Sequence, residues 1–124
     1  MKRVLLDTNM LMAVAQFRVD IFRQLQELCD FTYEVAVLDK TIAELEHIKA
    51  TQRSAAHAAA RVALQLVKLK KIHIIETPEG KGVDALLAEL SHQGAIVATQ
   101  DKELKQQLKR PYIILRQKRR LVLL

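Results

Sequence analysis

Val4-Leu5-Leu6-Asp7-Thr8-Asn9-Met10-Leu11 opens the chain with a short apolar run that ends at an acidic residue. The run has the length and content of a buried strand. Comparable apolar runs follow at residues 35–38, 72–75, 95–98 and 112–115. Segments with amphipathic helical spacing separate them, and near-continuous apolar strands of this kind are typical of parallel sheets. The sequence therefore predicts an α/β fold with a mostly parallel central sheet.

Helical periodicity fills the gaps between these runs. Apolar residues recur every three or four positions in residues 21–28, 42–48, 54–69, 83–90 and 104–108. Strands that alternate with helices favour right-handed crossovers and helices on both faces of the sheet, which is a three-layer α/β/α arrangement. The last four residues, 121–124, fit either a final edge strand or a packed tail.

The size and composition of the chain bound its organisation. A chain of 124 residues buries roughly two thirds of its unfolded surface, so we expect one domain over residues 1–124. No apolar run approaches the roughly 18 residues of a membrane span, and we expect a soluble protein without a membrane partner. Cys29 is the only cysteine, which excludes an intramolecular disulfide and fits a cytoplasmic location.

Positive charge is concentrated near the end of the chain. The formal net charge is +6, and eight of the 20 lysines and arginines lie between Lys102 and Arg120. Basic side chains gain free energy by displacing counterions from phosphates, so this patch indicates a polyanionic partner. The alternative is that these charges solvate a helix face and deter pairing at a sheet edge.

Four acids are placed where a parallel sheet collects its ligands. Asp7 follows the first apolar run directly, and Asp101 follows the run 95–98 after two polar residues. Glu44 lies one to two turns into the helix after the second run, and Asp84 lies in the first turn of the helix after the loop 78–82. Ligand sites form outside the carboxyl ends of such strands. We therefore expect these four carboxylates at one edge of the sheet.

A group of four carboxylates implies a cation. The charges repel one another strongly near neutral pH unless a divalent ion lies between them, and hard oxygen ligands favour Mg²⁺ or Mn²⁺. Each acid also has a purely structural interpretation. Asp7 or Asn9 could cap a helix, and Asp84 and Asp101 could each complement a helix dipole from the first turn.

Glu44 has the most specific structural alternative. Thr41-Ile42-Ala43-Glu44 fits a capping box, in which the glutamate side chain bonds back to the amide of Thr41. In that case Glu46 would be the reserve metal ligand.

Taken together, these segments resemble the PIN-domain nucleases. The opening Val4-to-Leu11 stretch is similar to that family's strand ending in Asp-Thr/Ser-Asn, and Thr41-Ile42-Ala43-Glu44-Leu45 is similar to its Glu-Leu element. Asp84-Ala85-Leu86-Leu87 and Ile96-Val97-Ala98-Thr99-Gln100-Asp101 resemble its third and fourth acidic motifs. The ending Pro111-Tyr112-Ile113-Ile114-Leu115 is similar to compact archaeal members related to small-subunit ribosomal RNA processing nucleases.

The resemblance implies a PIN-like fold and a metal-dependent endoribonuclease that hydrolyses phosphodiester bonds of single-stranded or structured RNA. It assigns Asp7 and Asp101 as principal ligands of one or two Mg²⁺ or Mn²⁺ ions, with Glu44 and Asp84 completing the set. Asn9 and Thr99 would orient a carboxylate or the scissile phosphate. Val83 stands where many relatives carry a second acid, which leaves fewer ligands for a second ion.

The same resemblance leaves partners and alternatives open. Lys102, Lys105, Arg116 and Lys118 would form a basic rim for the RNA backbone. A homodimer, an antitoxin and a ribosome-assembly protein are the protein partners that it suggests. The alternatives to a processing nuclease are a VapC-type toxin ribonuclease and a non-catalytic RNA-binding PIN domain.

Overall fold

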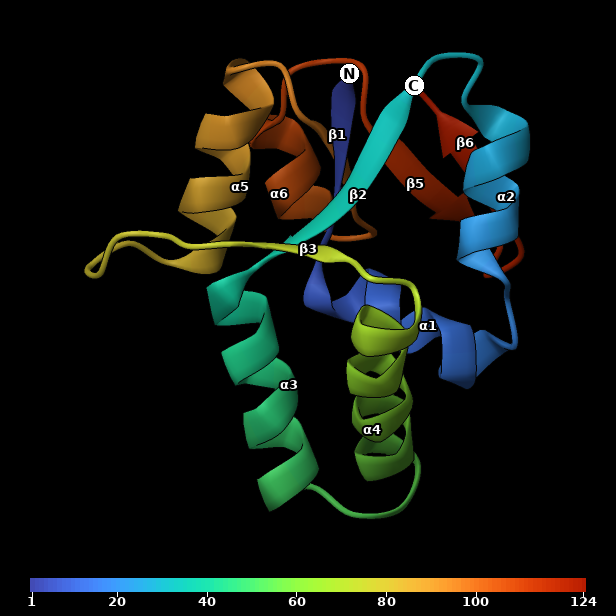
Figure 1. Cartoon of the computed structure of the whole chain (residues 1–124), viewed down its shortest axis with the longest axis vertical. Helices are drawn as coiled ribbons and strands as arrows, with labels where there is room; N and C mark the ends of the chain where they lie inside the picture. Colours follow the sequence, from blue (N-terminus) through green and yellow to red (C-terminus); the bar gives the residue numbers. More distant parts are fainter.

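The computed structural model describes all residues from Met1 to Leu124. Its centre is a six-stranded sheet with the strand order β3-β2-β1-β4-β5-β6 (Figure 1). The strands are β1 (Lys2–Leu6), β2 (Tyr33–Leu38), β3 (His73–Ile75), β4 (Ile96–Ala98), β5 (Ile113–Arg116) and β6 (Arg120–Leu123). The first five run parallel and β6 runs antiparallel to β5. The predicted mostly parallel sheet is confirmed.

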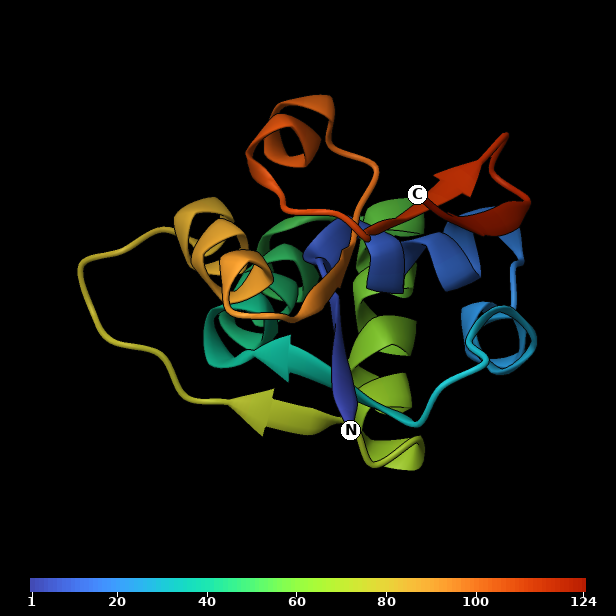
Figure 2. The ribbon, with the colours of Figure 1, turned by 90° about the horizontal axis from the view of Figure 1, so that it is seen from above.

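Helices cover both faces of this sheet. They are α1 (Thr8–Phe17), α2 (Ile21–Leu28), α3 (Asp39–Thr51), α4 (Ser54–Leu69), α5 (Val83–His92) and α6 (Lys102–Gln107). Figure 2 shows α5 and α6 on one side of β1, and α1, α2 and α4 on the other. The predicted three-layer arrangement is therefore confirmed.

The core consists of two apolar clusters that the sheet separates. Within β1, Val4 and Leu6 belong to the larger cluster beneath α1 and α4, whereas Leu5 points into the smaller cluster with α5 and α6. This alternation follows from the two-residue period of a strand. Because both faces of β1 are covered, its last three residues are all apolar and buried.

The helical pair α3 and α4 extends beyond the sheet. The two helices pack against each other and project below the carboxyl ends of the strands (Figure 1). The alanine-rich sequence of α4 buries Ala59, Ala60 and Ala63, which allows close approach of α1 and α3. No helix is both long and apolar enough to cross a membrane.

The end of the chain is an edge strand rather than a tail. Gln24 of α2 fixes it in place, because its side-chain amide donates to the backbone oxygen of Arg119 at 2.7 Å and its side-chain oxygen accepts from the amide of Leu121 at 2.7 Å. This contact joins residues almost a hundred positions apart. The sequence alone therefore did not decide between an edge strand and a packed tail for residues 121–124.

Replacing Gln24 tests this contact. Gln24→Ala should lower the free energy of unfolding by about 1–2 kcal/mol, because it removes two hydrogen bonds to backbone groups of the edge strand. Urea denaturation measures the change. Gln26→Ala, at an exposed position of the same helix, is the matched control and should stay within about 0.5 kcal/mol of the wild type; equal losses in both variants would contradict the role of Gln24.

Candidate active site

The predicted acids lie around the carboxyl ends of β1, β2 and β4. β1 and β4 are parallel neighbours, with Leu6 opposite Ala98, and the amide of Asp7 donates to the backbone oxygen of Ala98 at 3.2 Å. Asp7 and Asp101 therefore follow the ends of two neighbouring strands. Figure 1 shows the starts of α1, α3 and α5 at this same lower edge of the sheet.

Asp7 is the buried centre of this edge, with only 7% of its surface exposed. It is the N-cap of α1, and its Oδ1 accepts a 2.7 Å hydrogen bond from the amide of Met10. Its other oxygen, Oδ2, accepts from the hydroxyl of Thr99. The structural and functional interpretations of Asp7 are therefore compatible, because one carboxylate both caps the helix and faces the other acids.

The environment raises the pKa of Asp7 from 3.8 to about 6. Burial is the largest cause, since it removes water from the charged form. The hydrogen bonds from Thr99 and Met10 lower the pKa, and repulsion from Asp84 and then Asp101 raises it. Asp7 therefore carries a charge at neutral pH that nothing in the chain neutralises.

Thr99 connects two of the acids. It is fully buried at the end of β4, donates its hydroxyl to Asp7, and accepts a 3.0 Å hydrogen bond from the amide of Asp101 through the same oxygen. It thus fixes the carboxylate of Asp7 and the backbone that carries Asp101. Asn9, by contrast, is exposed in the first turn of α1, and none of the side-chain hydrogen bonds involves it.

Removing the hydroxyl of Thr99 tests whether it holds Asp7 and the backbone of Asp101 in place. Thr99→Val keeps the shape but leaves a buried carboxylate oxygen and an amide without their partner, at a cost of about 1–3 kcal/mol in unfolding free energy. It should also raise the pKa of Asp7 further. Thr99→Ser, which keeps the hydroxyl, is the control in urea denaturation; a Thr99→Val protein as stable as Thr99→Ser would contradict the bridging role.

Glu44 is held by a residue that the sequence interpretation passed over. Its Oε2 accepts a 3.2 Å hydrogen bond from the hydroxyl of Thr8, which lies next to Asp7. The capping-box alternative is wrong, because α3 already begins at Asp39 and Leu38 is its N-cap. Thr41 therefore lies inside the helix, where its buried hydroxyl has no hydrogen-bond partner.

Asp84 and Asp101 are exposed at the starts of two helices. Asp84 lies in the first turn of α5. Asp101 is the N-cap of α6, and its Oδ1 accepts from the amides of Glu103 at 2.9 Å and Leu104 at 3.2 Å. Both acids act on the charge of Asp7, so they lie near enough for an electrostatic interaction.

The donor set suits a hard divalent cation in its chemistry. All four candidate side chains offer carboxylate oxygens, and the repulsion that Asp84 and Asp101 exert on Asp7 is of the kind that a cation relieves. No three histidine, cysteine, aspartate or glutamate side chains lie close enough together to hold a metal ion as they stand. Coordination by three of the acids would need these side chains to come closer together, and Glu44, Asp84 and Asp101 are exposed.

A second network at the same edge was missed. The carboxylate of Asp39 accepts from the hydroxyl of Thr77 at 2.5 Å and from its amide at 3.1 Å, which lowers the pKa of Asp39. Lys40 donates to the Thr77 hydroxyl at 2.7 Å and to the backbone oxygen of Pro78 at 2.6 Å. These bonds tie the loop before α5 to the start of α3. The signal was available, because Asp39 directly follows a strand.

The residues of the predicted basic rim lie at two separate places in the fold. Lys102 and Lys105 lie on α6, beside Asp101, whereas Arg116 ends β5 and Lys118 lies in the turn that follows. α6 and this turn lie well apart in Figures 1 and 2.

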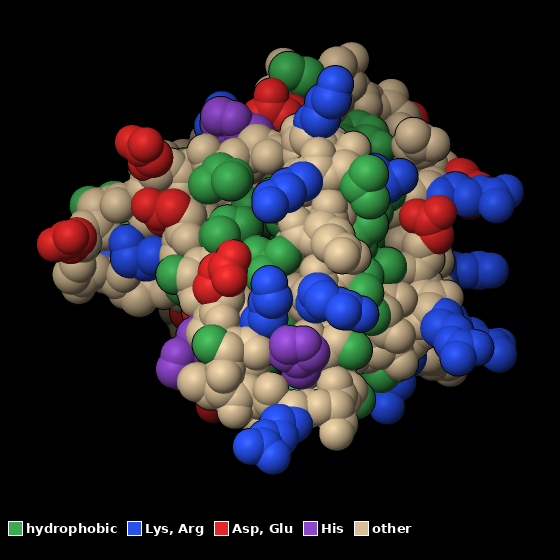
Figure 3. All heavy atoms as spheres, turned by 60° about the horizontal axis from the view of Figure 1, so that its bottom comes forward, with side chains coloured by type: hydrophobic (Ala, Val, Ile, Leu, Met, Phe, Trp, Pro, Cys, Tyr) green, Lys and Arg blue, Asp and Glu red, His purple; other side chains and the backbone are tan.

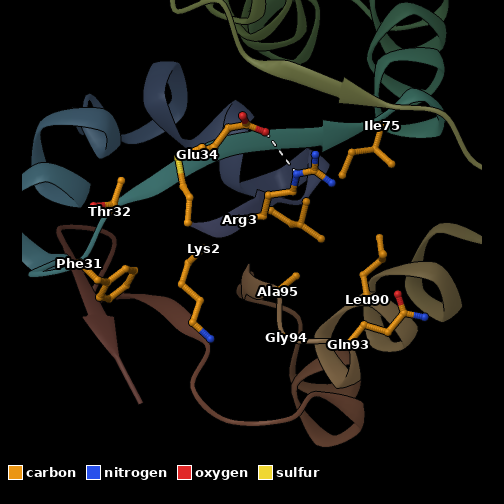
Figure 4. Close-up of a pocket in the computed structure, with 12 residues that line it drawn as sticks. Lys2, Arg3, Phe31, Thr32, Glu34, Ile75, Leu90, Gln93, Gly94 and Ala95 are labelled. Carbon is orange, nitrogen blue, oxygen red and sulfur yellow. Dashed lines mark hydrogen bonds and ion pairs between the residues drawn. The ribbon is translucent and has the colours of Figure 1, made fainter.

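A pocket of about 740 Å³ lies at the opposite end of the sheet. Figure 4 shows its lining, which includes Lys2, Arg3 and Glu34 from the starts of β1 and β2, with Leu90 and Gln93 from the end of α5. Arg3 and Glu34 form a 3.2 Å ion pair across the sheet. None of the four candidate acids lines this pocket, so it is separate from the carboxylate edge.

Comparisons with known proteins agree with this arrangement. Residues 4–118 match the family model described as "PIN like domain". The chain is 35% identical to Ribonuclease VapC9 of Archaeoglobus fulgidus over 83% of this chain and 73% of that protein. It is 26% identical to Ribonuclease VapC4 of Methanocaldococcus jannaschii, over 96% of this chain and 94% of that protein.

Solved structures share the fold. The PIN domain endonuclease Utp24 superposes with a TM-score of 0.75 at 23% identity, covering 98% of this chain and 90% of that one. PAE2754 from Pyrobaculum aerophilum superposes with a TM-score of 0.60 at 23% identity, covering 92% and 91% of the two chains. With its acids at the carboxyl ends of β1, β2 and β4 and a family match over almost its whole length, the chain belongs to the PIN-domain family of nucleases.

Proposed function

We propose that this protein is a Mg²⁺- or Mn²⁺-dependent endoribonuclease whose site consists of Asp7, Glu44, Asp84 and Asp101. The observation that carries the proposal is the state of Asp7. It is a buried carboxylate with a raised pKa, and two further acids act on it without any neutralising cation from the chain. Buried charge that the fold leaves uncompensated is typical of a functional site.

Asp7 and Asp101 would hold the ion most directly, and Glu44 and Asp84 would complete its ligands themselves or through water. A divalent cation bound there supplies Lewis-acid activation of water and stabilises the negative charge that develops on the phosphate. The fold contributes positioning. Thr99 and the amide of Met10 fix both oxygens of Asp7, and Thr8 fixes one oxygen of Glu44.

RNA is the proposed substrate. Both curated relatives are named ribonucleases, and the net charge of +6 favours a polyanion. Nothing in the arrangement of Lys102 and Lys105 reads a base, so the backbone would be recognised rather than the sequence. We place the reaction in the cytoplasm and treat residues 1–124 as one catalytic unit, either monomeric or paired in a homodimer.

Because both relatives carry the name VapC, a toxin restrained by an antitoxin is the second candidate. Expression of the chain alone tests it: a toxin should arrest growth, and the arrest should disappear with Asp7→Asn. Normal growth with the active wild-type protein would favour a processing nuclease, with a ribosome-assembly protein as its candidate partner.

Glu44 and Glu46 offer a matched pair for testing the site. Both are exposed glutamates of α3, but only Glu44 is hydrogen-bonded to Thr8. Glu44→Gln should reduce Mn²⁺-dependent cleavage of labelled single-stranded RNA about a hundredfold, because a neutral amide is a much weaker metal ligand. Glu46→Gln should cleave as the wild type does. If only Glu46→Gln loses activity, Glu46 rather than Glu44 is the metal ligand.

A further inference from the structure

Positive charge gathers at the corner where the end of α1 meets the β5–β6 hairpin. The hairpin patch is defined by its five members, Arg18, Arg116, Lys118, Arg119 and Arg120, all of which are exposed. Figure 3 shows Lys and Arg side chains along the right side of the molecule, the side of α2 and this hairpin. The ion pairs of the structure are Arg3–Glu34, Arg23–Glu27 and Lys81–Glu89. No member of the patch therefore forms an ion pair with a carboxylate.

A surface groove accompanies the charge. It lies between α2 and the hairpin, has a volume of about 760 Å³, and is lined by Arg116, Arg119 and Arg120 among others. The only acid in its lining is Glu27, which already pairs with Arg23 at 3.4 Å. The groove thus offers a concave, strongly positive surface.

Two members of the patch, Arg18 and Lys118, have a positive φ, a backbone conformation that residues other than glycine and asparagine rarely adopt. Gln117 and Lys118 occupy the two central positions of the turn, with φ of 54° and 57°, where asparagine and glycine are preferred. Arg18 is the C-cap of α1 and has a φ of 53°, a left-handed conformation in which glycine is the usual residue.

Pairing across the hairpin adds to this. Arg116 lies directly opposite Arg120 in the register of β5 and β6, and like charges so placed destabilise a sheet. Departures from local preference that gather at one corner indicate a functional surface rather than a solvated edge.

The patch lies at the far end of α1 from Asp7. Lys118 lies 5.1 Å from the ring centre of Phe17, the last residue of α1. Asp7 caps the other end of the helix, and ten helical residues span about 15 Å. The distance from the carboxylate edge to the patch is therefore short enough for a few nucleotides to span.

We propose that the hairpin patch is an anchoring site for RNA phosphates, separate from the carboxylates and a few nucleotides away from the bond that is cut. The proposal rests on the proposed function in taking RNA as the polyanion. Exposed arginines with no acid partner, in a groove, bind phosphates through charge and counterion release. They would hold the substrate without reading its sequence, so the patch should set affinity for long RNA and leave the chemical step unchanged.

The hairpin allows a variant that loses charge without losing stability. Arg116→Thr combined with Arg120→Thr removes the repelling pair and places two threonines opposite each other, which is favourable in a sheet. Its Tm should equal or exceed that of the wild type. Lys68→Gln with Lys71→Gln removes the same charge from exposed positions at the end of α4, away from the hairpin in Figure 2, and is the matched control.

Binding is measured by fluorescence anisotropy with a labelled single-stranded RNA of about 20 nucleotides, in EDTA and over a range of salt concentrations. The hairpin variant should bind more weakly, and the slope of log Kd against log salt should fall by about 1.4, or about 0.7 for each phosphate that the variant no longer neutralises. The control should keep the wild-type slope. An unchanged slope in the hairpin variant would overturn the proposal and leave a protein partner as the explanation for the patch.

Cleavage assays separate this proposal from the one on which it rests. A dinucleotide, too short to reach from the carboxylate edge to the patch, should be cut equally by the wild type and the hairpin variant in Mn²⁺. A long RNA should show a raised KM in the variant with an unchanged kcat. Because the binding titration is made in EDTA, a wild type that cuts no RNA would overturn the nuclease function while leaving the phosphate-binding result to stand by itself.

Discussion

Asp7→Asn is expected to reduce RNA cleavage about a thousandfold, or about 4 kcal/mol in the activation barrier, and at the same time to stabilise the fold. Activity falls because the substitution removes the most central carboxylate. Stability rises because the charged form of Asp7 is disfavoured in its buried position, where the pKa is about 6 rather than 3.8. In EDTA at pH 7 the gain in unfolding free energy should reach up to about 3 kcal/mol.

The direction of the pH dependence follows from the raised pKa. Between pH 3.8 and about 6 the folded protein holds the proton of Asp7 more tightly than the unfolded chain does. The stability that this group contributes is therefore complete below its unfolded pKa and is lost as the pH rises through 6. The stability difference between Asp7→Asn and the wild type should grow over this interval and level off above it.

Asp20→Asn is the control for that comparison. Asp20 caps α2 as Asp7 caps α1, with its side chain accepting from the amide of Arg23 at 3.1 Å, but it is exposed. Asparagine caps helices about as well as aspartate, so this variant should match the wild type in stability and in cleavage. Equal stability of Asp7→Asn and the wild type at every pH would contradict the strained state of Asp7.

Mn²⁺ should stabilise the wild-type protein. At a concentration a hundred times its Kd, an ion that binds only the folded state adds about 2.7 kcal/mol to the free energy of unfolding. It would do so here by relieving the repulsion of Asp7 by Asp84 and Asp101. Thermal denaturation with increasing Mn²⁺ measures the shift in Tm.

The Mn²⁺-induced shift in Tm can be compared between the wild type, Asp7→Asn and Asp20→Asn. Asp7→Asn should show little shift, because it lacks a principal ligand and its site is already relieved of one charge. Asp20→Asn should show the full shift. A similar gain in Tm for all three proteins would indicate that Mn²⁺ binds elsewhere on the surface.

The strands were predictable because their signal is local. Each apolar run is buried on both faces of a parallel sheet, so the pattern is continuous and short, and every predicted run forms a strand. The order of the strands is not local. Asp7 and Asp101 lie at adjacent strand ends because β1 pairs with β4, which is more than ninety residues further along the chain. The sequence alone did not show whether these two strands are neighbours.

The positions of the four acids near strand ends and helix starts were predictable, but the contacts that hold these side chains were not. Glu44 fits a capping box by sequence, yet in the folded chain it bonds to Thr8, 36 residues away. Thr99 was expected to orient a carboxylate, and it does bond to Asp7. The position of Asp39 directly after a strand was visible in the sequence, but its contact with Thr77 forms only once β2 and β3 pair.

The charged end of the chain shows the same limit. Residues 102–118 looked like one basic rim because they are close in sequence. A turn after α6 sends the chain into β5, so Lys102 stays beside Asp101 while Arg116 and Lys118 move to the far end of α1. The sequence therefore predicted a positively charged surface, but it did not show that these residues lie at two separate places.

The most direct test of the proposed nuclease is cleavage of an end-labelled single-stranded RNA by the wild-type protein in Mn²⁺ and in EDTA, with analysis of the product ends. We predict internal cleavage that requires the metal, leaves 5′-phosphate and 3′-hydroxyl ends, and is absent in Asp7→Asn. Cleavage that persists in EDTA, or that Asp7→Asn retains in full, would contradict a reaction carried out at the carboxylate edge.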